Sequence, residues 1–252
     1  MRALTHVPSS NLHHGQRTHV PRQAIDEALA LQQHRAYCQM LRDCGAEVRT
    51  LDVNRDLPDA TFLEDTAIVL DEVAVLASMG TEARRRELAG IEPELRKYRA
   101  VERVEVPATL EGGDVLRVGR RLLVGVSCRT NLAGVQAFEA IVGRYGYPVV
   151  PVPVLHCLHL KTACTALPDG SLLVNPSWLE MERLRDCEIV CVPEDEPWAA
   201  NTLPVGQSVC LAGEHGQTAD LLRRRGFDVR TVPLSEFAKA EGGVTCLSLL
   251  FD

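Results

Sequence analysis

Apolar and polar residues repeat one pattern several times along this chain of 252 residues. Two short apolar stretches flank a polar turn of two or three residues, which is typical of a β-hairpin. The copies are 66–77 (turn Asp71-Glu72), 114–126 (turn Gly119-Arg120), 162–175 (turn Pro168-Asp169-Gly170) and 201–213 (turn Gly206-Gln207). The turn centres lie about 40 to 50 residues apart, a spacing typical of propellers and repeat arrays.

The two ends of the chain supply a fifth copy. Residues 245–252 are predicted to form one strand, and residues 1–8 are predicted to form its partner. Pairing of these two segments would close a ring of repeats.

Amphipathic helices separate the hairpins. We expect one from Pro21 to a stop at Gly45, one capped by Asn131 and running through Tyr145 to Gly146, and a short one bracketed by Gly216 and Gly226. Another strand follows each helix or connection, at 47–53, 101–107, 148–154 and 228–234. The sequence therefore predicts an α/β fold, a five-bladed α/β propeller of ββαβ units with pseudo-fivefold symmetry, in which residues 1–252 form a single domain.

Composition and charge limit the classes of binding partner and the cellular compartment that we expect. The net charge of -7 argues against a nucleic-acid or anionic-membrane partner. The N-terminus lacks the apolar core of a secretory signal, and no run approaches the roughly 20 apolar residues of a membrane span. The nine cysteines are odd in number and scattered, without a CxxC pair, so we expect thiols and a cytoplasmic protein.

Polar residues recur directly before the first strand of four of the hairpins, or at its first residue. They lie in DATFLED (59–65), TLEGGD (109–114), LHLKT (158–162) and GGVTC (242–246). Equivalent positions in different blades point toward one place on the axis of a propeller. We therefore expect Asp65, Glu111, His159 and Cys246 to meet there, with Gly242-Gly243 allowing a close backbone approach.

This set of side chains fits nucleophilic chemistry on a cation. A cysteine with a histidine is a nucleophile with a general acid and base, and carboxylates match a planar guanidinium. A zinc site is the competing interpretation, but the usual local zinc-binding spacings are absent. Taken singly, Cys246 also reads as a core thiol, His159 as a structural histidine and Glu111 as a turn residue.

Four motifs resemble, in order and spacing, the dimethylarginine dimethylaminohydrolase family of the guanidino-modifying (pentein) superfamily, related to arginine deiminase. They are FLEDTAIVLDEVAVL, TLEGGDVLRVGRRLLVGVSCRTN, LHLKTACTA and KAEGGVTCLSLLF. The resemblance implies that Cys246 attacks the guanidinium carbon to form a covalent S-alkylthiouronium, that His159 is the acid and base, and that Glu111 partners His159. It implies no cofactor and no metal.

The resemblance also implies a set of substrate-binding residues. Glu64 and Asp65 match the acidic pair that binds the guanidinium, with Asp59 nearby. Arg84 and Arg129 match two arginines that hold the substrate α-carboxylate. The remaining matches are Ala240 and Glu241, next to the α-amino group, Leu12, which covers the ligand from the lid loop 11–19, and Phe62, which with Leu12 sets the pocket size.

The chain departs from the family pattern before Arg84, and also at the nucleophile, where many relatives carry tandem cysteines and this chain has Thr245-Cys246-Leu247. Ala77-Ser78-Met79-Gly80 stands where relatives often carry Arg-Pro-Gly, which leaves room for a rearranged carboxylate clamp. The leading hypothesis is hydrolysis of Nω-methylated L-arginine to L-citrulline and dimethylamine or methylamine. The alternatives are a hydrolase or deiminase of arginine or another guanidino compound, and a non-catalytic binding protein for arginine analogues. The expected partner is this small guanidino molecule, and a homodimer is common among relatives.

Overall fold

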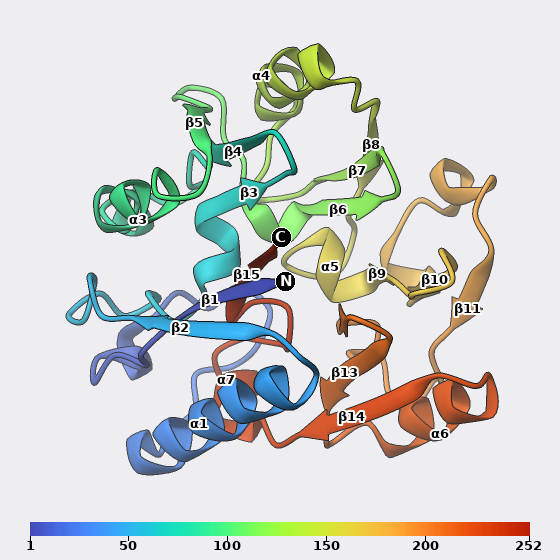
Figure 1. The fold of residues 1–252 in the computed structure, drawn as a ribbon. Helices are drawn as coiled ribbons and strands as arrows, with labels where there is room; N and C mark the ends of the chain where they lie inside the picture. Colours follow the sequence, from blue (N-terminus) through green and yellow to red (C-terminus); the bar gives the residue numbers. More distant parts are fainter.

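Five three-stranded sheets surround a central axis in the computed structural model, which describes residues 1–252 (Figure 1). In order of pairing, the strands of the sheets are β15 (Ser248–Phe251), β1 (Arg2–His6) and β2 (Glu47–Leu51); β3 (Ala67–Val69), β4 (Val73–Leu76) and β5 (Ala100–Arg103); β6 (Val115–Val118), β7 (Arg121–Val126) and β8 (Val149–Pro153); β9 (Cys164–Ala166), β10 (Leu172–Val174) and β11 (Ile189–Cys191); β12 (Thr202–Val205), β13 (Ser208–Ala212) and β14 (Asp228–Val232).

Helices connect the strands of each sheet and precede several of the hairpins. The α-helices are α1 (Glu27–Asp43), α2 (Glu82–Arg85), α3 (Leu88–Leu95), α4 (Leu132–Val142), α5 (Leu160–Ala163), α6 (Gly216–Arg224) and α7 (Ser235–Ala238). The 3₁₀ turns are η1 (Leu12–His14), η2 (Leu63–Thr66), η3 (Gly112–Asp114), η4 (Gly143–Tyr145), η5 (Pro176–Trp178) and η6 (Met181–Leu184).

Each sheet repeats one topology. Its first two strands pair antiparallel, and the third strand pairs parallel to the second after a crossover. Helices α1, α3, α4 and α6 make four of these crossovers and lie on the outside of the ring, whereas η5 and η6 make the crossover between β10 and β11 (Figure 1). The expectation of a five-bladed α/β propeller is confirmed.

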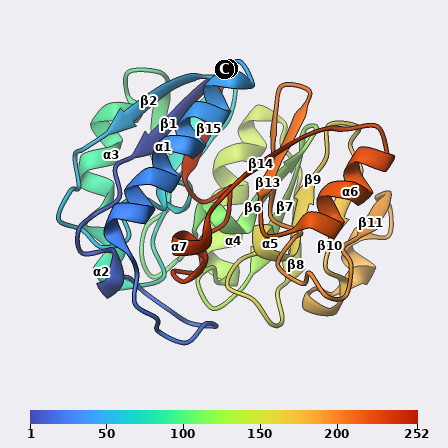
Figure 2. The same ribbon diagram turned by 90° about the horizontal axis from the view of Figure 1, so that it is seen from below.

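The ends of the chain close the ring. β1 pairs antiparallel with β15, from Arg2 opposite Phe251 to Thr5 opposite Ser248. The amino group of Met1 lies 3.1 Å from a carboxylate oxygen of Asp252. In Figure 2 the C-terminus lies at one face, and the dark blue loop between β1 and α1 lies at the other.

Helix α1 begins later than the sequence indicated. The expected start at Pro21 is wrong, because Asp26 is the N-cap and its carboxylate accepts a 3.0 Å hydrogen bond from the backbone N–H of Leu29. An aspartate satisfies a free N–H at a helix start, which proline cannot do. The Asn131 cap of α4 is confirmed by a 2.7 Å bond from the N–H of Gly134.

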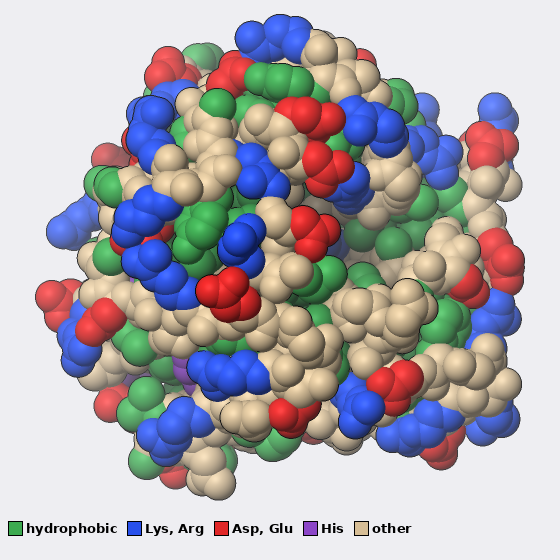
Figure 3. Space-filling view, in the orientation of Figure 1, with side chains coloured by type: hydrophobic (Ala, Val, Ile, Leu, Met, Phe, Trp, Pro, Cys, Tyr) green, Lys and Arg blue, Asp and Glu red, His purple; other side chains and the backbone are tan.

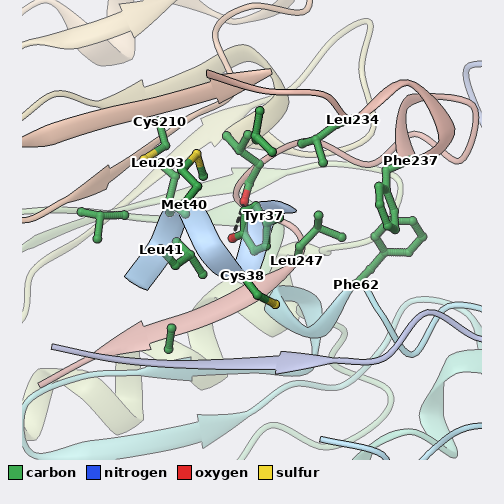
Figure 4. Packing of buried hydrophobic residues seen from close by; sticks show 14 of the residues in the cluster. Tyr37, Cys38, Met40, Leu41, Phe62, Leu203, Cys210, Leu234, Phe237 and Leu247 are labelled. Atoms are coloured by element: carbon green, nitrogen blue, oxygen red, sulfur yellow. Dashed lines mark hydrogen bonds between the residues drawn. The ribbon is translucent and has the colours of Figure 1, made fainter. Parts of the chain in front are cut away.

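The buried face of α1 packs against the segment that leads into β15. Tyr37 and Leu41 share one apolar cluster with Phe62, Phe237 and Leu247 (Figure 4). The Tyr37 hydroxyl donates a 2.8 Å hydrogen bond to the carbonyl of Val244 and lies 2.7 Å from the Ser248 hydroxyl, on both sides of Cys246 in the chain. This cluster therefore fixes the segment that carries Cys246.

The surface is mixed in charge. On the face drawn in Figure 3, Lys and Arg side chains are interspersed with Asp and Glu. None of the helices has the length and apolar character that crossing a membrane requires.

Candidate active site

The polar segments that precede four of the hairpins converge on one small cavity of about 20 Å³. Most of the residues singled out in the sequence line it. The lining residues are Gln16, Asp59, Phe62, Asp65, Arg84, Glu111, Arg129, Leu158, His159, Ala240, Glu241 and Cys246.

Glycines let these segments approach each other. A Cβ on Gly112 would lie 2.0 Å from the carbonyl oxygen of Glu64, and one on Gly113 would lie 2.6 Å from Nδ1 of His159. No side chain fits at either position, so the two glycines of the EGGD motif are required by packing. They bring the segment that carries Glu111 against the segments that carry Asp65 and His159.

His159 immediately precedes α5 and is fixed from two directions. Its Nε2 lies 2.7 Å from a carboxylate oxygen of Glu111, which is fully buried. Asp114 accepts a 2.9 Å hydrogen bond from the N–H of Leu160 and holds the start of α5. Burial lowers the pKa of His159, but the charges of Asp65 and Asp114 and the bond to Glu111 outweigh it and raise the pKa to about 9.

Cys246 lies between the glycine turn and β15 and is partly exposed. Its Sγ accepts a long hydrogen bond, 3.4 Å, from the backbone N–H of Gly243. Burial, followed by the charges of Glu64 and Asp65, raises the pKa of the thiol to about 12. Near neutral pH the site without substrate therefore holds a thiol and an imidazolium.

Asp65 joins the histidine to a buried arginine. One of its oxygens lies 3.7 Å from Nδ1 of His159 and accepts a 3.1 Å bond from the N–H of Gly113. The other lies 2.6 Å from Arg84. Burial raises the pKa of Asp65, but the charges of His159 and Arg84 outweigh it and lower the pKa below its ordinary value. Asp65 is therefore held as a carboxylate.

Arg84 is occupied by protein groups. It pairs with both Asp65 and Glu87, and its Nη2 also donates a 3.0 Å bond to the carbonyl of Phe62. Arg129 is less constrained. Its guanidinium lies 3.7 Å from Glu111 and donates a 3.2 Å bond to the hydroxyl of Thr18 in the lid loop.

Glu64 is buried and does not line the cavity. Its carboxylate lies 2.5 Å from Nζ of Lys161 and accepts a 2.6 Å bond from the hydroxyl of Thr245. Burial raises the pKa of Glu64 despite the nearby lysine. The Glu64–Lys161 pair therefore lies behind the cavity and supports the residue directly before Cys246.

The lid loop is closed over the cavity. Both oxygens of Asp59 lie 3.1 Å from the backbone N of Gln16. The Glu241 carboxylate accepts hydrogen bonds from the backbone N–H groups of Thr18, His19 and Val20. Glu241 has a φ of +61°, and no other residue apart from glycine has a positive φ. This conformation aims its side chain at the loop.

Leu12 and Gln16 differ from the sequence expectation. The side chain of Leu12 belongs to the apolar cluster around Phe62 and does not line the cavity, because the turn η1 directs it inward. Gln16, four residues later, lines the cavity instead. An apolar residue type favoured Leu12 as the residue that covers the ligand. Only the backbone path of the loop shows that Gln16, and not Leu12, faces the cavity.

Other residues at the site were missed for similar reasons. Leu158 lines the cavity, and Asn201 accepts a 3.1 Å bond from the N–H of Thr245 and donates a 3.0 Å bond to its hydroxyl. Leu158 begins the LHLKT segment that the repeat pattern singled out, and Asn201 is the first residue of the 201–213 hairpin. Their position relative to the first strand of a hairpin was the available signal.

Asp65, Glu111 and His159 also present donor atoms within 4.8 Å of one another, a spacing that could hold a metal ion. Each donor already has a protein partner. Asp65 binds Arg84, Glu111 accepts a 3.0 Å bond from the N–H of Gly80, and His159 binds Glu111. This set is better matched to a cation with N–H groups than to a bare ion.

Comparisons with known proteins agree with this geometry. The family model described as N,N dimethylarginine dimethylhydrolase, eukaryotic, matches residues 8–164. The N(G),N(G)-dimethylarginine dimethylaminohydrolase of Streptomyces coelicolor is 41% identical over 249 residues, which cover 98% of this chain and 96% of that protein.

Solved structures show the same relation. A mutant of DDAH from Pseudomonas aeruginosa, complexed with citrulline, superposes with a TM-score of 0.95 at 32% identity, and the match covers 99% of this chain and 98% of that chain. The N-terminal domain of the cyanobacterial arginine dihydrolase ArgZ matches with a TM-score of 0.87 at 23% identity, over 98% of this chain and 97% of that chain, which shows the shared fold.

Proposed function

Because this chain belongs to the dimethylarginine dimethylaminohydrolase family, we propose that it hydrolyses Nω-methylated L-arginine to L-citrulline and dimethylamine or methylamine. One observation supports this most directly: Cys246, His159 and Glu111 line the same cavity as the carboxylates of Asp59 and Asp65. A nucleophile and a protonated acid beside carboxylates suit a substrate whose reacting group is a flat cation.

We propose that carboxylates bind the guanidinium and hold it planar. Asp65 is held ionised by its neighbours, and burial raises the pKa of Asp59. A bound guanidinium favours the ionised form of both, because opposite charges at short range stabilise each other. Glu64 contributes from behind, through Lys161 and Thr245.

In the first half-reaction, the positive charge of the bound substrate lowers the pKa of Cys246 and favours the thiolate. Sγ attacks the guanidinium carbon and forms a tetrahedral adduct. The bond to the methylated nitrogen then breaks as His159 donates a proton to that nitrogen. The amine leaves, and an S-alkylthiouronium remains on Cys246.

In the second half-reaction, His159 has lost its proton and can accept one from water. The resulting hydroxide attacks the same carbon, the C–S bond breaks with its electron pair leaving on Sγ, and the protonated ureido product transfers a proton to the thiolate, which gives citrulline and the free thiol. Glu111 stays hydrogen-bonded to the imidazole and stabilises its protonated form in both halves, which is the role of a carboxylate behind a histidine base.

The amino-acid end of the substrate needs its own anchors. Arg129 is the better placed of the two arginines for the α-carboxylate, because Arg84 is committed to Asp65 and Glu87. Ala240 and Glu241 line the cavity at the position proposed for the α-amino group. Phe62 forms part of the wall.

The test is turnover of separate guanidino substrates by the purified protein. We expect ureido product from dimethylarginine and monomethylarginine. Turnover of arginine or agmatine alone would replace this proposal by a deiminase or another guanidino hydrolase. Binding of arginine analogues without any product would indicate the non-catalytic alternative.

The covalent step has its own test. A Cys246→Ser variant should lose turnover, while Cys191→Ser, at an exposed thiol in β11, should keep it. A haloamidine should add its mass to the wild type and to Cys191→Ser, but not to Cys246→Ser. Unchanged turnover in Cys246→Ser would exclude the covalent route.

We also propose that residues 1–252 act as a single catalytic domain in the cytoplasm. Pairing of β1 with β15 supports the first point, and nine free cysteines are compatible with a reducing compartment. We propose a homodimer because homodimers are common among relatives, and light scattering of the purified protein tests this oligomeric state.

A further inference from the structure

A second cavity reaches Cys246 from another side. Its volume is about 190 Å³, against about 20 Å³ for the cavity that contains the acids and His159. Cys246 and Glu241 line both cavities, whereas His159 and Asp65 line only the smaller one. Cys246 therefore lies in the wall that the two cavities share.

The walls of the second cavity combine apolar and acidic groups with one histidine, His215, whose pKa is lowered by burial. Trp198, Val20 and Leu234 supply apolar surface, and Trp198 is 36% exposed. Glu214 supplies a carboxylate; Glu241 also lines the cavity, but its two oxygens accept N–H groups of the lid loop. One oxygen of Glu214 accepts a 3.3 Å bond from the N–H of Leu234, which leaves the other available for a ligand.

This lining suits one class of small molecule. An alkylammonium ion carries a positive charge with N–H donors and one or more methyl groups. Carboxylates bind the charged end, apolar walls accept the methyl groups, and the face of a tryptophan attracts a nearby cation. A negatively charged or purely apolar ligand matches these walls less well.

Because the lid is closed, small molecules need another route to and from Cys246. Thr18, His19 and Val20 are held to Glu241, and Gln16 is held to Asp59, so the smaller cavity is covered. The proposed reaction releases an amine while the rest of the substrate is still bonded to Cys246. Water must then reach the same carbon before citrulline can leave.

We propose that the second cavity binds small alkylammonium ions and is the passage through which the amine product leaves and water arrives while the lid stays closed. This inference rests on the proposed function. The amine departs neutral, with the proton from His159 on its nitrogen, and takes a second proton from water in the cavity, since alkylamines are protonated near neutral pH. Glu214 and Trp198 then hold the cation on its way out.

Binding can be tested without catalysis. The chain has two tryptophans, and Trp198 stacks edge-on against Trp178 with ring centres 4.7 Å apart. Dimethylammonium chloride should change the tryptophan fluorescence at constant ionic strength, more than ammonium chloride does. Trp198→Phe should abolish the change, and Glu214→Gln should weaken the binding about tenfold. Equal responses to the two salts, or none, would overturn the site.

Passage can be tested by narrowing the cavity. Ala238 lines it and is exposed, so Ala238→Phe should fold, and Ala140→Phe, at an exposed position of α4, is the matched control. We expect Ala238→Phe to lower kcat for dimethylarginine about tenfold, with the thiouronium adduct on Cys246 accumulating in acid-quenched samples. The control should match the wild type.

The outcomes separate the two proposals. Wild-type protein that does not act on methylarginines refutes the proposed function, whatever the salts show. Wild-type turnover with an unaffected Ala238→Phe variant refutes the passage. A raised KM with unchanged kcat in that variant would also refute it, because the cavity would then admit substrate instead of releasing the amine.

Discussion

Glu241 provides the clearest quantitative prediction, because its side chain accepts three hydrogen bonds from the lid loop. Its two carboxylate oxygens accept the N–H groups of Thr18, His19 and Val20, two of them at 2.8 Å. We expect Glu241→Ala to favour the open lid. Alanine meets the same backbone cost as glutamate at a φ of +61°, so the difference from wild type reports the side chain.

The size of the effect follows from the contacts. A hydrogen bond to a charged group contributes about 1.5 to 3 kcal/mol, and partial exposure and non-additivity reduce the sum of three to roughly 2 to 4 kcal/mol. Since 1.4 kcal/mol is a factor of ten, lid closure weakens by about 30-fold or more. Glu241→Gln keeps an acceptor oxygen and loses the charge, so its effect should be several-fold smaller.

Two assays check this reasoning. The value of kcat/KM for dimethylarginine should fall by at least the factor by which lid closure weakens, because Glu241 also lies at the position proposed for the α-amino group. Trypsin should cleave faster at Arg17 in the lid loop and at Arg22 just after it, and this cleavage reports the lid alone. Glu180→Ala is the control, because the exposed pair of Glu180 with Arg183 contributes little. Unchanged kcat/KM together with unchanged proteolysis in Glu241→Ala would refute the latch.

Three further predictions concern protonation and packing. Because the pKa of Cys246 is raised to about 12, ultraviolet titration of the free protein should show no Cys246 thiolate near pH 8. Addition of a substrate analogue should produce the thiolate. A Cys246 thiolate in the free protein at this pH would contradict the prediction. The pKa of His159 in the folded state, about 9, lies above its ordinary value of 6.5. Its contribution to the free energy of unfolding is therefore complete below pH 6.5 and is lost as the pH rises through 9. Denaturant titrations of Glu111→Gln should show a weaker dependence of this free energy on pH. Gly134→Ala places a Cβ 1.8 Å from a backbone carbonyl oxygen and should lower Tm strongly, whereas Gly143→Ala meets nothing within 4 Å and should leave Tm unchanged or slightly higher.

The fold was predictable because it repeats. Each hairpin carries the same alternation and turn, so errors in one copy are corrected by the others, and the pairing of both ends follows from the need to complete a blade. The start of α1 was not predictable from Pro21, because residues 21–25 continue the lid loop and Asp26 supplies the cap. The crossover through η5 and η6 likewise carries no helical pattern.

The site was predictable only in part. Repeat position singled out Asp65, Glu111, His159 and Cys246, which the structure places around one cavity. The position of a residue in the repeat did not predict which side chains contact one another. The commitment of Arg84 to its two carboxylates depends on the path of the backbone around it, and no local pattern reports that path.

Closure of the ring by the two chain ends has a consequence for biosynthesis. The blade that directly follows the catalytic sulfur pairs β1 with β15, a strand that is synthesised much later. While β15 is still inside the exit tunnel, it cannot pair with β1, and Cys246 has no fixed position. A nascent or truncated chain that lacks a paired β15 should therefore be inert, so that reactivity toward guanidino compounds appears only once β15 has left the ribosome.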